Sequence, residues 1–172
     1  MLILTPVADS VISSLKIYDK LEITGSIYTG RDAALPKLVQ MIEKDELEKY
    51  GINLNGSIIF HTAVSPAGIG PTSSNKLDIE GSIPMLSKAG VKIHIGKGRL
   101  SQTTVDVLKE YNSIFAVNPP VSALLTSTIQ NKKIVAFEEE GMEAMHVLQV
   151  KNFSAIVAIA HGQSIFDDKG DK

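Results

Sequence analysis

Cysteine is absent from this sequence of 172 residues, which limits the chemistry that the chain can perform alone. The chain forms no disulfide and offers no thiol nucleophile. It also lacks the thiolate ligands that hold structural zinc or an iron–sulfur cluster. The four histidines are scattered without a His-x-x-x-His pair, so we expect no metal site built from this chain alone.

Long hydrophobic runs and a strong net charge are missing as well. No apolar run approaches the roughly 20 residues of a membrane-spanning helix, and residues 1–6 lack the basic flank of a secretory signal. The net charge is −2 and the pI is near 6.1, so the overall field of the protein does not attract nucleic acid. We therefore expect a cytoplasmic protein without a membrane or nucleic-acid partner.

The sequence does contain a regular alternation of short apolar runs and amphipathic helical patterns. The apolar runs, each of which predicts a buried strand, are 58–60, 91–95, 114–117, 134–137 and 155–159. The helical patterns begin near Ala33, Asp78, Ser101 and Pro119. This order is typical of an α/β domain with flanking helices and a mostly parallel central sheet whose strands are covered on both faces.

Three segments fall outside this alternation. Residues 15–28 alternate apolar and polar positions and predict two strands with a turn at 19–20, which would form a smaller, half-exposed β layer. Residues 1–15 predict an arm, and the charged residues 166–172 predict a flexible tail. We expect a single domain over residues 1–165, followed by that tail.

The stretch 65–76 is the most unusual part of the chain. It holds two prolines, two glycines, four hydroxyl side chains and a lysine between an apolar run and a helical pattern. These residues predict a loop, because proline lacks a backbone donor and glycine leaves the backbone free. The segments 28–32 and 95–99 have a similar character and carry Arg31 and Lys97. Because such crossings favour anions and lie beyond the carboxyl ends of strands, we expect the three loops to converge on a small anion.

The cations of these loops favour one class of anion. Arg31, Lys76 and Lys97 suit a dicarboxylate better than a single phosphate, because two separated carboxylates need two separated partners. Each cation also has an ordinary explanation: an arginine paired with Asp32, a surface lysine, and a lysine in a tight turn. Phosphate-binding patterns fail on spacing, since Val91 stands where a Walker A motif needs its first glycine.

The other candidate groups have structural explanations. The hydroxyls at 72–74 are typical of a helix cap, and Thr72 would act as an acid or base only beside a group that corrects its pKa. His61 and His94 lie in or beside apolar strands, where a satisfied structural histidine is the commoner case. The glutamates at 138–140 are typical of a solvated loop or the start of a helix.

Three segments taken together resemble a known family. They are Gly-Ser-Ile-Tyr-Thr-Gly-Arg-Asp-Ala-Ala at 25–34, Gly-Pro-Thr-Ser-Ser-Asn-Lys-Leu-Asp at 70–78 and Ile-Gly-Lys-Gly at 95–98, with further similarity at 137–138 and 153–159. In this order they resemble the β subunit, or C-terminal domain, of class I fumarate hydratases and L-tartrate dehydratases over nearly the whole chain. The resemblance implies a swivelling β/β/α domain that forms half of an iron–sulfur hydro-lyase, with the [4Fe–4S] cluster on a partner α subunit.

The resemblance also implies roles for individual residues. By position, Thr72 is similar to the residue assigned to proton transfer, which makes it the implied catalytic residue. The implied substrate-binding residues are Arg31, Asp32, Gly70, Lys76, Gly96 and Lys97. The chain departs from the family at three places: Lys76 replaces the usual arginine, Leu35 replaces the usual histidine, and Asn-Pro-Pro-Val at 118–121 replaces a segment rich in glycine and alanine.

These implications lead to one leading expectation and three alternatives. We expect the β subunit of a fumarate hydratase-type hydro-lyase, which hydrates fumarate reversibly to malate only together with its α subunit. An L-tartrate dehydratase β subunit is the second candidate, and a small-anion-binding module of the same fold without the chemistry is the rival from another class. A free-standing phosphate-handling enzyme has the least support. The sequence leaves a homodimer open.

Overall fold

The computed structural model describes residues 1–66, 68–72, 76–118 and 122–167, with the backbone alone for 70–72, 76–79 and 122–123. The strands are β1 (Leu2–Leu4), β2 (Lys20–Thr29), β3 (Ile58–Phe60), β4 (Thr62–Ser65), β5 (Gly68–Thr72), β6 (Ile93–Gly96), β7 (Ile114–Val117), β8 (Ile129–Ala136), β9 (Met145–Ala160) and β10 (Gln163–Ser164). The helices are α1 (Asp9–Ser14), α2 (Leu35–Glu43), α3 (Lys76–Lys88), α4 (Gln102–Glu110) and α5 (Ser122–Ser127), with the 3-10 helices η1 (Leu47–Tyr50) and η2 (Glu138–Glu143).

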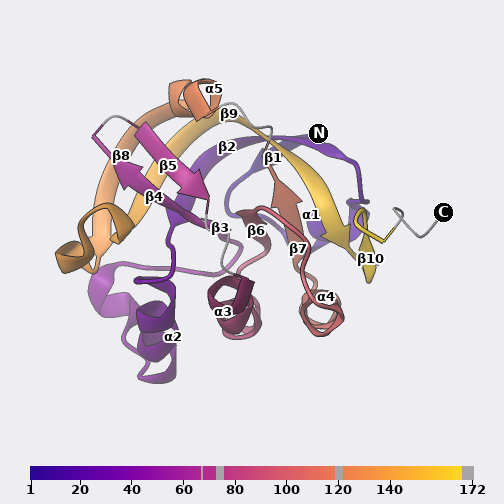
Figure 1. Ribbon diagram of the computed structural model, residues 1–172, viewed down its shortest axis with the longest axis horizontal. Coiled ribbons are helices and arrows are strands. Elements are labelled where there is room, and N and C mark those ends of the chain that lie inside the picture. The colour runs from indigo at the N-terminus through magenta and orange to yellow at the C-terminus, as the bar shows by residue number, and fades with distance from the viewer. Residues whose placement is uncertain (67, 73–75, 119–121, 168–172) are drawn as a thin grey trace.

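Parallel strands form the centre of the main sheet. β2 pairs in parallel with β1 near its start and with β3 near its end, and β3, β6 and β7 continue the parallel order. The long strand β9 then runs antiparallel to both β2 and β7, so that β2, β3, β6, β7 and β9 close into a ring. β9 also pairs with β8 along its first half and with β10 at its end. The two long strands β2 and β9 arch side by side across the molecule in Figure 1.

The period-two pattern of the strands decides which side chains fill the ring. Ile58 and Phe60 of β3 belong to the main core cluster, to which β2, β6, β7 and β9 also contribute. Phe60 and Phe153 meet edge to face there, with ring centres 5.5 Å apart. Ile59 and Phe115 instead belong to separate clusters outside the ring. The strands β3, β6 and β7 are therefore buried on both faces, as their near-continuous apolar sequences predict.

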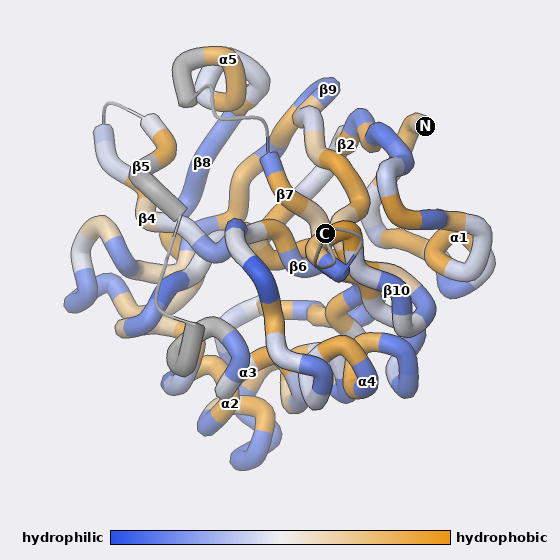
Figure 2. The backbone as a smooth tube through the Cα atoms, turned by 45° about the vertical axis from the view of Figure 1, so that its right-hand side comes forward, coloured by the Kyte–Doolittle hydropathy of each residue, from blue (hydrophilic) through white to orange (hydrophobic). Residues whose placement is uncertain are grey.

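Helices α2, α3 and α4 cover the outer face of the parallel strands and lie in a row beneath the sheet in Figure 1. Pro36 lies in the first turn of α2, where a missing backbone N–H costs nothing. The Ser101 hydroxyl caps α4 by accepting a hydrogen bond from the backbone N–H of Thr104. Coloured by hydropathy, the backbone is mostly apolar along β6, β7 and the neighbouring part of β9 and polar toward the outer turns (Figure 2).

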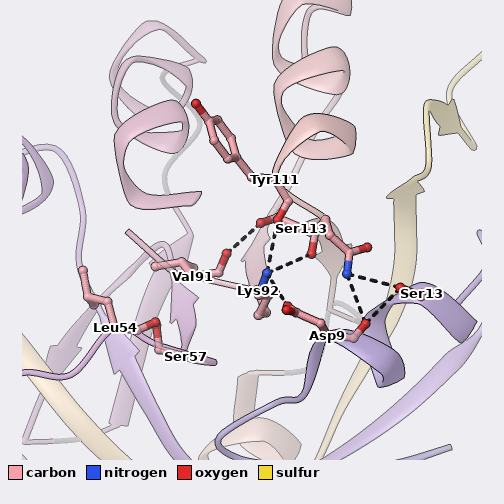
Figure 3. Close-up of polar contacts among 9 residues, drawn as sticks. Asp9, Ser13, Leu54, Ser57, Val91, Lys92, Tyr111 and Ser113 are labelled. Carbon is pink, nitrogen blue, oxygen red and sulfur yellow. Dashed lines mark hydrogen bonds and ion pairs between the residues drawn. The ribbon is translucent and has the colours of Figure 1, made fainter. Parts of the chain in front are cut away.

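A polar cluster ties α1 to the amino-terminal end of the parallel strands. The Lys92 ammonium lies 2.6 Å from an Asp9 carboxylate oxygen and donates hydrogen bonds to the carbonyl oxygens of Tyr111, at 3.1 Å, and Asn112, at 3.5 Å (Figure 3). The Asn112 side-chain amide in turn donates to the Asp9 carbonyl oxygen and to the Ser13 hydroxyl. This cluster joins three segments that are far apart in the sequence and serves the fold.

The mixed α/β class and its parallel centre are confirmed. β3 and β7 have the predicted bounds, and α2 and α4 begin within two residues of the predicted starts. The first helix after the 65–76 stretch begins earlier than expected, so that Asp78 lies in its first turn rather than at its cap. β9 is far longer than the apolar run 155–159, because its first half has polar residues on its exposed positions.

Two predictions for the N-terminal region are wrong. Residues 15–28 do not form two strands: α1 ends at Ser14, a turn follows at 17–18, and a single strand, β2, begins at Lys20, where the turn was predicted. Leu15, with which the predicted alternation begins, is fully buried, but it caps the C-terminal end of α1 instead of starting a strand. Residues 1–15 are not an arm either, because β1 pairs with β2 and Ile3 is buried in the main core.

The stretch 65–76 is not a loop throughout, which corrects a third prediction. β5 pairs antiparallel with β4, and this hairpin forms the separate small sheet that was expected from residues 15–28. Glycine and proline are tolerated in β5 because, among the described strands, it pairs with β4 alone. Residues 73–75, which join β5 to α3, lie outside the described residues.

Candidate functional site

The carboxyl ends of three adjacent parallel strands meet at one edge of the sheet. The backbone N–H of Gly30, just after β2, donates to the Phe60 carbonyl oxygen at the end of β3, at 3.1 Å. The next N–H along β3, that of His61, donates to the Ile95 carbonyl oxygen of β6, at 2.8 Å. Because paired strands lie about 4.8 Å apart, the backbones that lead into Arg31 and Lys97 are about 10 Å apart across β3.

The β4–β5 hairpin returns Thr72 to this same edge. Thr62 comes directly after His61, and Thr72 is its pairing partner across the hairpin. Lys76 then opens α3, whose N-terminal end carries the positive end of the helix dipole. Gly70 lies within β5. The side chains of Thr72 and Lys76 lie outside the described residues, and the structure brings the backbone of Thr72 to the edge that carries those of Arg31 and Lys97.

Arg31 lies half-buried between β2 and α2 and faces an acid from a distant segment. Its Nε atom lies 3.3 Å from a carboxylate oxygen of Glu143, the last residue of η2. Both atoms are inaccessible to water, although the two side chains as a whole are 25% and 33% exposed. Asp32 occupies the turn that follows Arg31 and is half-buried. Sequence reasoning missed Glu143, because nothing in the local pattern connects it to a residue so far away.

Lys97 and Gly96 end β6 at the same edge but differ in their surroundings. Lys97 is exposed and, within the described part of the chain, has no ion pair or hydrogen bond. Gly96 is buried, and a Cβ atom there would meet the Phe115 ring at 3.2 Å. The absence of a side chain at Gly96 is thus explained by packing under the sheet, whereas Lys97 is available to a ligand.

Two buried histidines lie behind this edge. His61 Nε2 and His94 Nδ1 face each other at 3.4 Å, and His94 Nε2 lies 2.9 Å from the Ser87 hydroxyl of α3. Burial lowers the pKa of His61 to about 4, and burial with the neighbouring His61 lowers the pKa of His94 well below its usual value. Both rings are therefore neutral at pH 7. His94 is satisfied as predicted, but His61 is not, because its Nδ1 has no partner among the described residues.

Two residues at the positions where the chain departs from the family pattern have structural roles. Leu35 is 2% exposed and packs against Gly30, where a Cβ atom would lie 2.7 Å from a Leu35 methyl group. Asn118, directly after β7, donates a hydrogen bond from its side-chain amide to the Ser154 carbonyl oxygen at 3.0 Å. Residues 119–121 lie outside the described residues.

A groove opens beside the hairpin, between β4, β8 and η2. Its volume is about 550 Å³, and its lining includes Pro66, Lys133, Ile134, Met142 and His146. Lys132, at its border, donates a hydrogen bond to the Ser65 carbonyl oxygen at 2.8 Å and so ties β8 to the hairpin. The groove is open to solvent on the η2 side of the candidate site.

Metal-binding groups are sparse in this chain. In the ranges that the structure describes, no three side chains of His, Asp or Glu gather as a metal site would require, and the sequence has no cysteine. The residues present do not fit an iron–sulfur cluster held by this chain. Within the same ranges, no helix is long and apolar enough to cross a membrane.

Comparison with known proteins places these features in a family. The family described as "Fumarase C-terminus" matches residues 3–169. A Methanocaldococcus jannaschii protein that carries the name of an L(+)-tartrate dehydratase subunit beta is 30% identical over 176 residues, which cover 94% of this chain and 88% of that protein. The anaerobic class I fumarate hydratase of Escherichia coli K12 is 29% identical over 170 residues, covering 93% of this chain but 29% of that enzyme. The L(+)-tartrate dehydratase subunit beta of the same organism is 23% identical, with 97% and 90% covered.

Proposed function

The chain belongs to the fumarase C-terminus family, and from this premise we propose that it is the β subunit of a fumarate hydratase-type hydro-lyase. In this proposal it adopts the family's swivelling β/β/α arrangement and catalyses the reversible hydration of fumarate to malate together with a partner α subunit. A cytoplasmic location is part of the same proposal.

One observation carries the proposal most strongly: the candidate residues come from three separate segments and reach one edge of the sheet. Arg31 follows β2, Thr72 ends β5 opposite Thr62, and Lys97 follows β6, next to β3. Two cations on different strands suit the two separated carboxylates of a C4 dicarboxylate. A single phosphate would need its donors gathered around one centre.

In the proposed reaction each residue has a separate task. Arg31, Lys76 and Lys97 bind and orient the two carboxylates, and they neutralise charge that would otherwise oppose removal of a proton next to a carboxylate. Thr72 takes and returns that proton, which requires neighbouring positive charge to lower the pKa of its hydroxyl. Asp32, Gly70 and Gly96 belong to the loops that shape the binding site.

The partner is proposed from the relatives and from what this chain lacks. Two of the relatives are named as β subunits, whereas this chain spans about a third of the length of the class I fumarate hydratases. The [4Fe–4S] cluster is therefore assigned to an α subunit, because the sequence has no cysteine and, among the residues that the structure describes, no cluster of other metal-binding side chains. When bound there, a cluster iron would supply a Lewis acid for the hydroxyl that is added or removed.

Tartrate is the second candidate substrate. Relatives named for fumarate and for tartrate match this chain with similar identity, 29% and 30%. Lys76 would replace a bidentate guanidinium by a point charge, which loosens the geometry imposed on one carboxylate. The ratio of the two activities decides between the substrates.

The test is anaerobic turnover of fumarate and of L-tartrate by this chain, alone and mixed with a cluster-loaded α subunit. We expect activity only in the mixture. Thr72→Val should lower kcat by about a hundredfold or more, as expected for removal of a general base, while Thr72→Ser should retain a substantial part. The serine variant is the matched control, because it removes a methyl group and keeps the hydroxyl.

Two other results would contradict the proposal. Turnover that survives Thr72→Val would remove the proton-transfer role and favour a module that binds small anions without chemistry. A complex with an intact cluster that turns over neither substrate would point to a different dicarboxylate or to that binding module.

A further inference from the structure

We propose that Glu143 is a positioning residue for Arg31, and that η2 acts as a strap that fixes the substrate-binding loop between β2 and α2. The inference rests on the proposed function, since it takes Arg31 as a carboxylate-binding residue. It assigns a role in substrate binding to an acidic segment that lies over a hundred residues beyond that loop in the sequence.

The first step is the contact between the two side chains. Glu143 places a carboxylate oxygen 3.3 Å from Arg31 Nε in an ion pair without hydrogen-bond geometry, and water reaches neither atom. Charge pairs at such partly buried positions are screened less by salt than pairs on the open surface. The contact holds the guanidinium in place even when no ligand is bound.

The second step is the geometry of the guanidinium. Its five N–H donors lie in one rigid plane, so a carboxylate at Nε fixes the orientation of the whole group. The terminal nitrogens are the donors that bind a substrate carboxylate in a fork-to-fork arrangement. A guanidinium that is oriented in advance loses less freedom when substrate binds, and this lowers KM.

The third step is that η2 and the residues after it contact the two elements that flank the Arg31 loop, namely β2 before it and α2 after it. Lys37, in the first turns of α2, pairs with Glu139 at 3.0 Å and with Glu140 at 2.5 Å. The hydrogen bond with Glu140 raises the pKa of Lys37 most, and the hydrogen bond with Glu139 raises it further. After the strap, the backbone N–H of His146 donates to the Thr29 hydroxyl at the end of β2, at 3.3 Å. The strap is thus fastened to the elements before and after the Arg31 loop.

The turns of the strap explain how Glu143 reaches Arg31. Phe137 enters it with φ of 58° and Gly141 has φ of 60° and ψ of −119°, so the chain bends sharply at both places. Glycine adopts that second conformation without strain. The bend at Gly141 separates the part of η2 that binds Lys37 from the end that binds Arg31.

The experiment compares two glutamine variants in the reconstituted complex with a cluster-loaded α subunit. Glu143→Gln keeps the shape of the side chain and removes its charge, and we expect KM for the dicarboxylate to rise about tenfold with kcat changed less than about threefold. Glu138→Gln is the matched control: Glu138 begins the same strap, is exposed and has no ion pair within the described part of the chain. It should behave as the parent. Glu143→Asp should recover part of the affinity.

A second measurement reports on Arg31 without any turnover. The Nε–H resonance of Arg31 in the uncomplexed chain is assigned by its disappearance in Arg31→Lys. In Glu143→Gln this resonance should shift and its hydrogen should exchange faster with water, whereas Glu138→Gln should leave it unchanged. A stabilising contact without influence on the guanidinium would not produce this difference.

The outcomes separate the inference from the proposed function. An active parent whose KM is unchanged by Glu143→Gln, or raised equally by Glu138→Gln, would overturn the positioning role. An Arg31 resonance that is identical in the parent and in Glu143→Gln would overturn it as well. A parent complex without activity would overturn the proposed function instead, and the resonance would then decide alone whether Glu143 orients Arg31.

Discussion

Lys92 and Lys97 lie at opposite ends of the same strand, β6, and the fold treats them differently. The Lys92 side chain is 12% exposed, and its ammonium contacts Asp9 and the carbonyl oxygens of Tyr111 and Asn112. Lys97 is exposed and, among the described residues, contacts no acid or carbonyl oxygen. Figure 3 shows the contacts of the Lys92 ammonium with Asp9 and with the two carbonyl oxygens.

The difference separates a lysine that stabilises the fold, Lys92, from one that we propose to bind a ligand, Lys97. At the amino-terminal edge, the Lys92 ammonium binds protein oxygens in place of water and joins α1 to the turn before β7. Removal of this lysine would leave two carbonyl oxygens without their hydrogen-bond donor. At the carboxyl-terminal edge, Lys97 is exposed, and we propose that it binds an anion. Arg31 lies between these cases, since Glu143 holds one of its nitrogens at the open edge.

The largest expected effect concerns the histidines behind the carboxyl-terminal edge. Because the pKa of His61 is about 4 in the folded chain and near 6.5 when unfolded, the unfolded chain binds the proton first as pH falls. The free energy of unfolding should therefore be unaffected above pH 6.5 and should fall by about 3 kcal/mol toward pH 4 from His61, with a further loss from His94. Urea unfolding at a series of pH values measures this.

His61→Leu removes one of the two titrating groups and should flatten that acid loss. His161→Gln is the control, because His161 is exposed and forms a hydrogen bond to the Leu15 carbonyl oxygen at the surface. It should keep the full acid loss. If the free energy of unfolding of His61→Leu falls as steeply with decreasing pH as that of the parent, the acid sensitivity has a source other than the buried histidine pair.

The second effect tests Lys97 as a ligand-binding cation. Lys97→Met should lower kcat/KM of the reconstituted complex by about a hundredfold, the cost of losing a charge-assisted hydrogen bond to a carboxylate. The free energy of unfolding of the chain should stay within about 0.5 kcal/mol of the parent, because the side chain is exposed. Steady-state kinetics and urea unfolding on the same preparations measure both. A Lys97→Met chain that is destabilised but fully active would show that Lys97 stabilises the fold and does not bind the ligand.

The smallest effect is expected from the corresponding change at the other end of β6. Lys92→Met should lower the free energy of unfolding by about 2 kcal/mol, since two carbonyl oxygens and Asp9 lose their shared cation. The melting temperature should fall by about 4–8 °C, and KM and kcat of the complex should remain those of the parent. A rise in KM without loss of stability would mean that the amino-terminal edge contributes to the site.

Local patterns predicted much of this fold. The apolar runs at 58–60 and 114–117 became β3 and β7 with the same bounds, and the hydroxyl of Ser101 caps α4 as expected. Such signals are reliable because period, capping and proline position are decided by neighbouring residues. The prediction for the N-terminal region was wrong because its elements are too short to show such a pattern. Helix α1 has six residues, too few to show a helical period, and β1 has three.

The candidate site was predicted in part. The loops with Arg31 and Lys97 follow β2 and β6, which lie on either side of β3, and the carboxyl ends of these parallel strands meet at one edge. The hairpin within 65–76 was not predicted, since the glycines and prolines there are typical of a loop and the pairing with β4 outweighs that preference. No local signal connected Glu143 with Arg31.

The sequence by itself determined that the chain holds no cysteine ligand, that apolar strands alternate with helices, and that cations stand in the loops between them. These properties depend on residues close together in the chain. The tertiary structure alone decided that β9 closes the ring, that Thr72 returns to the edge beside β3, and that Glu143 lies beside Arg31. Contacts between distant segments follow from how whole elements pack, and no short stretch of sequence contains that information.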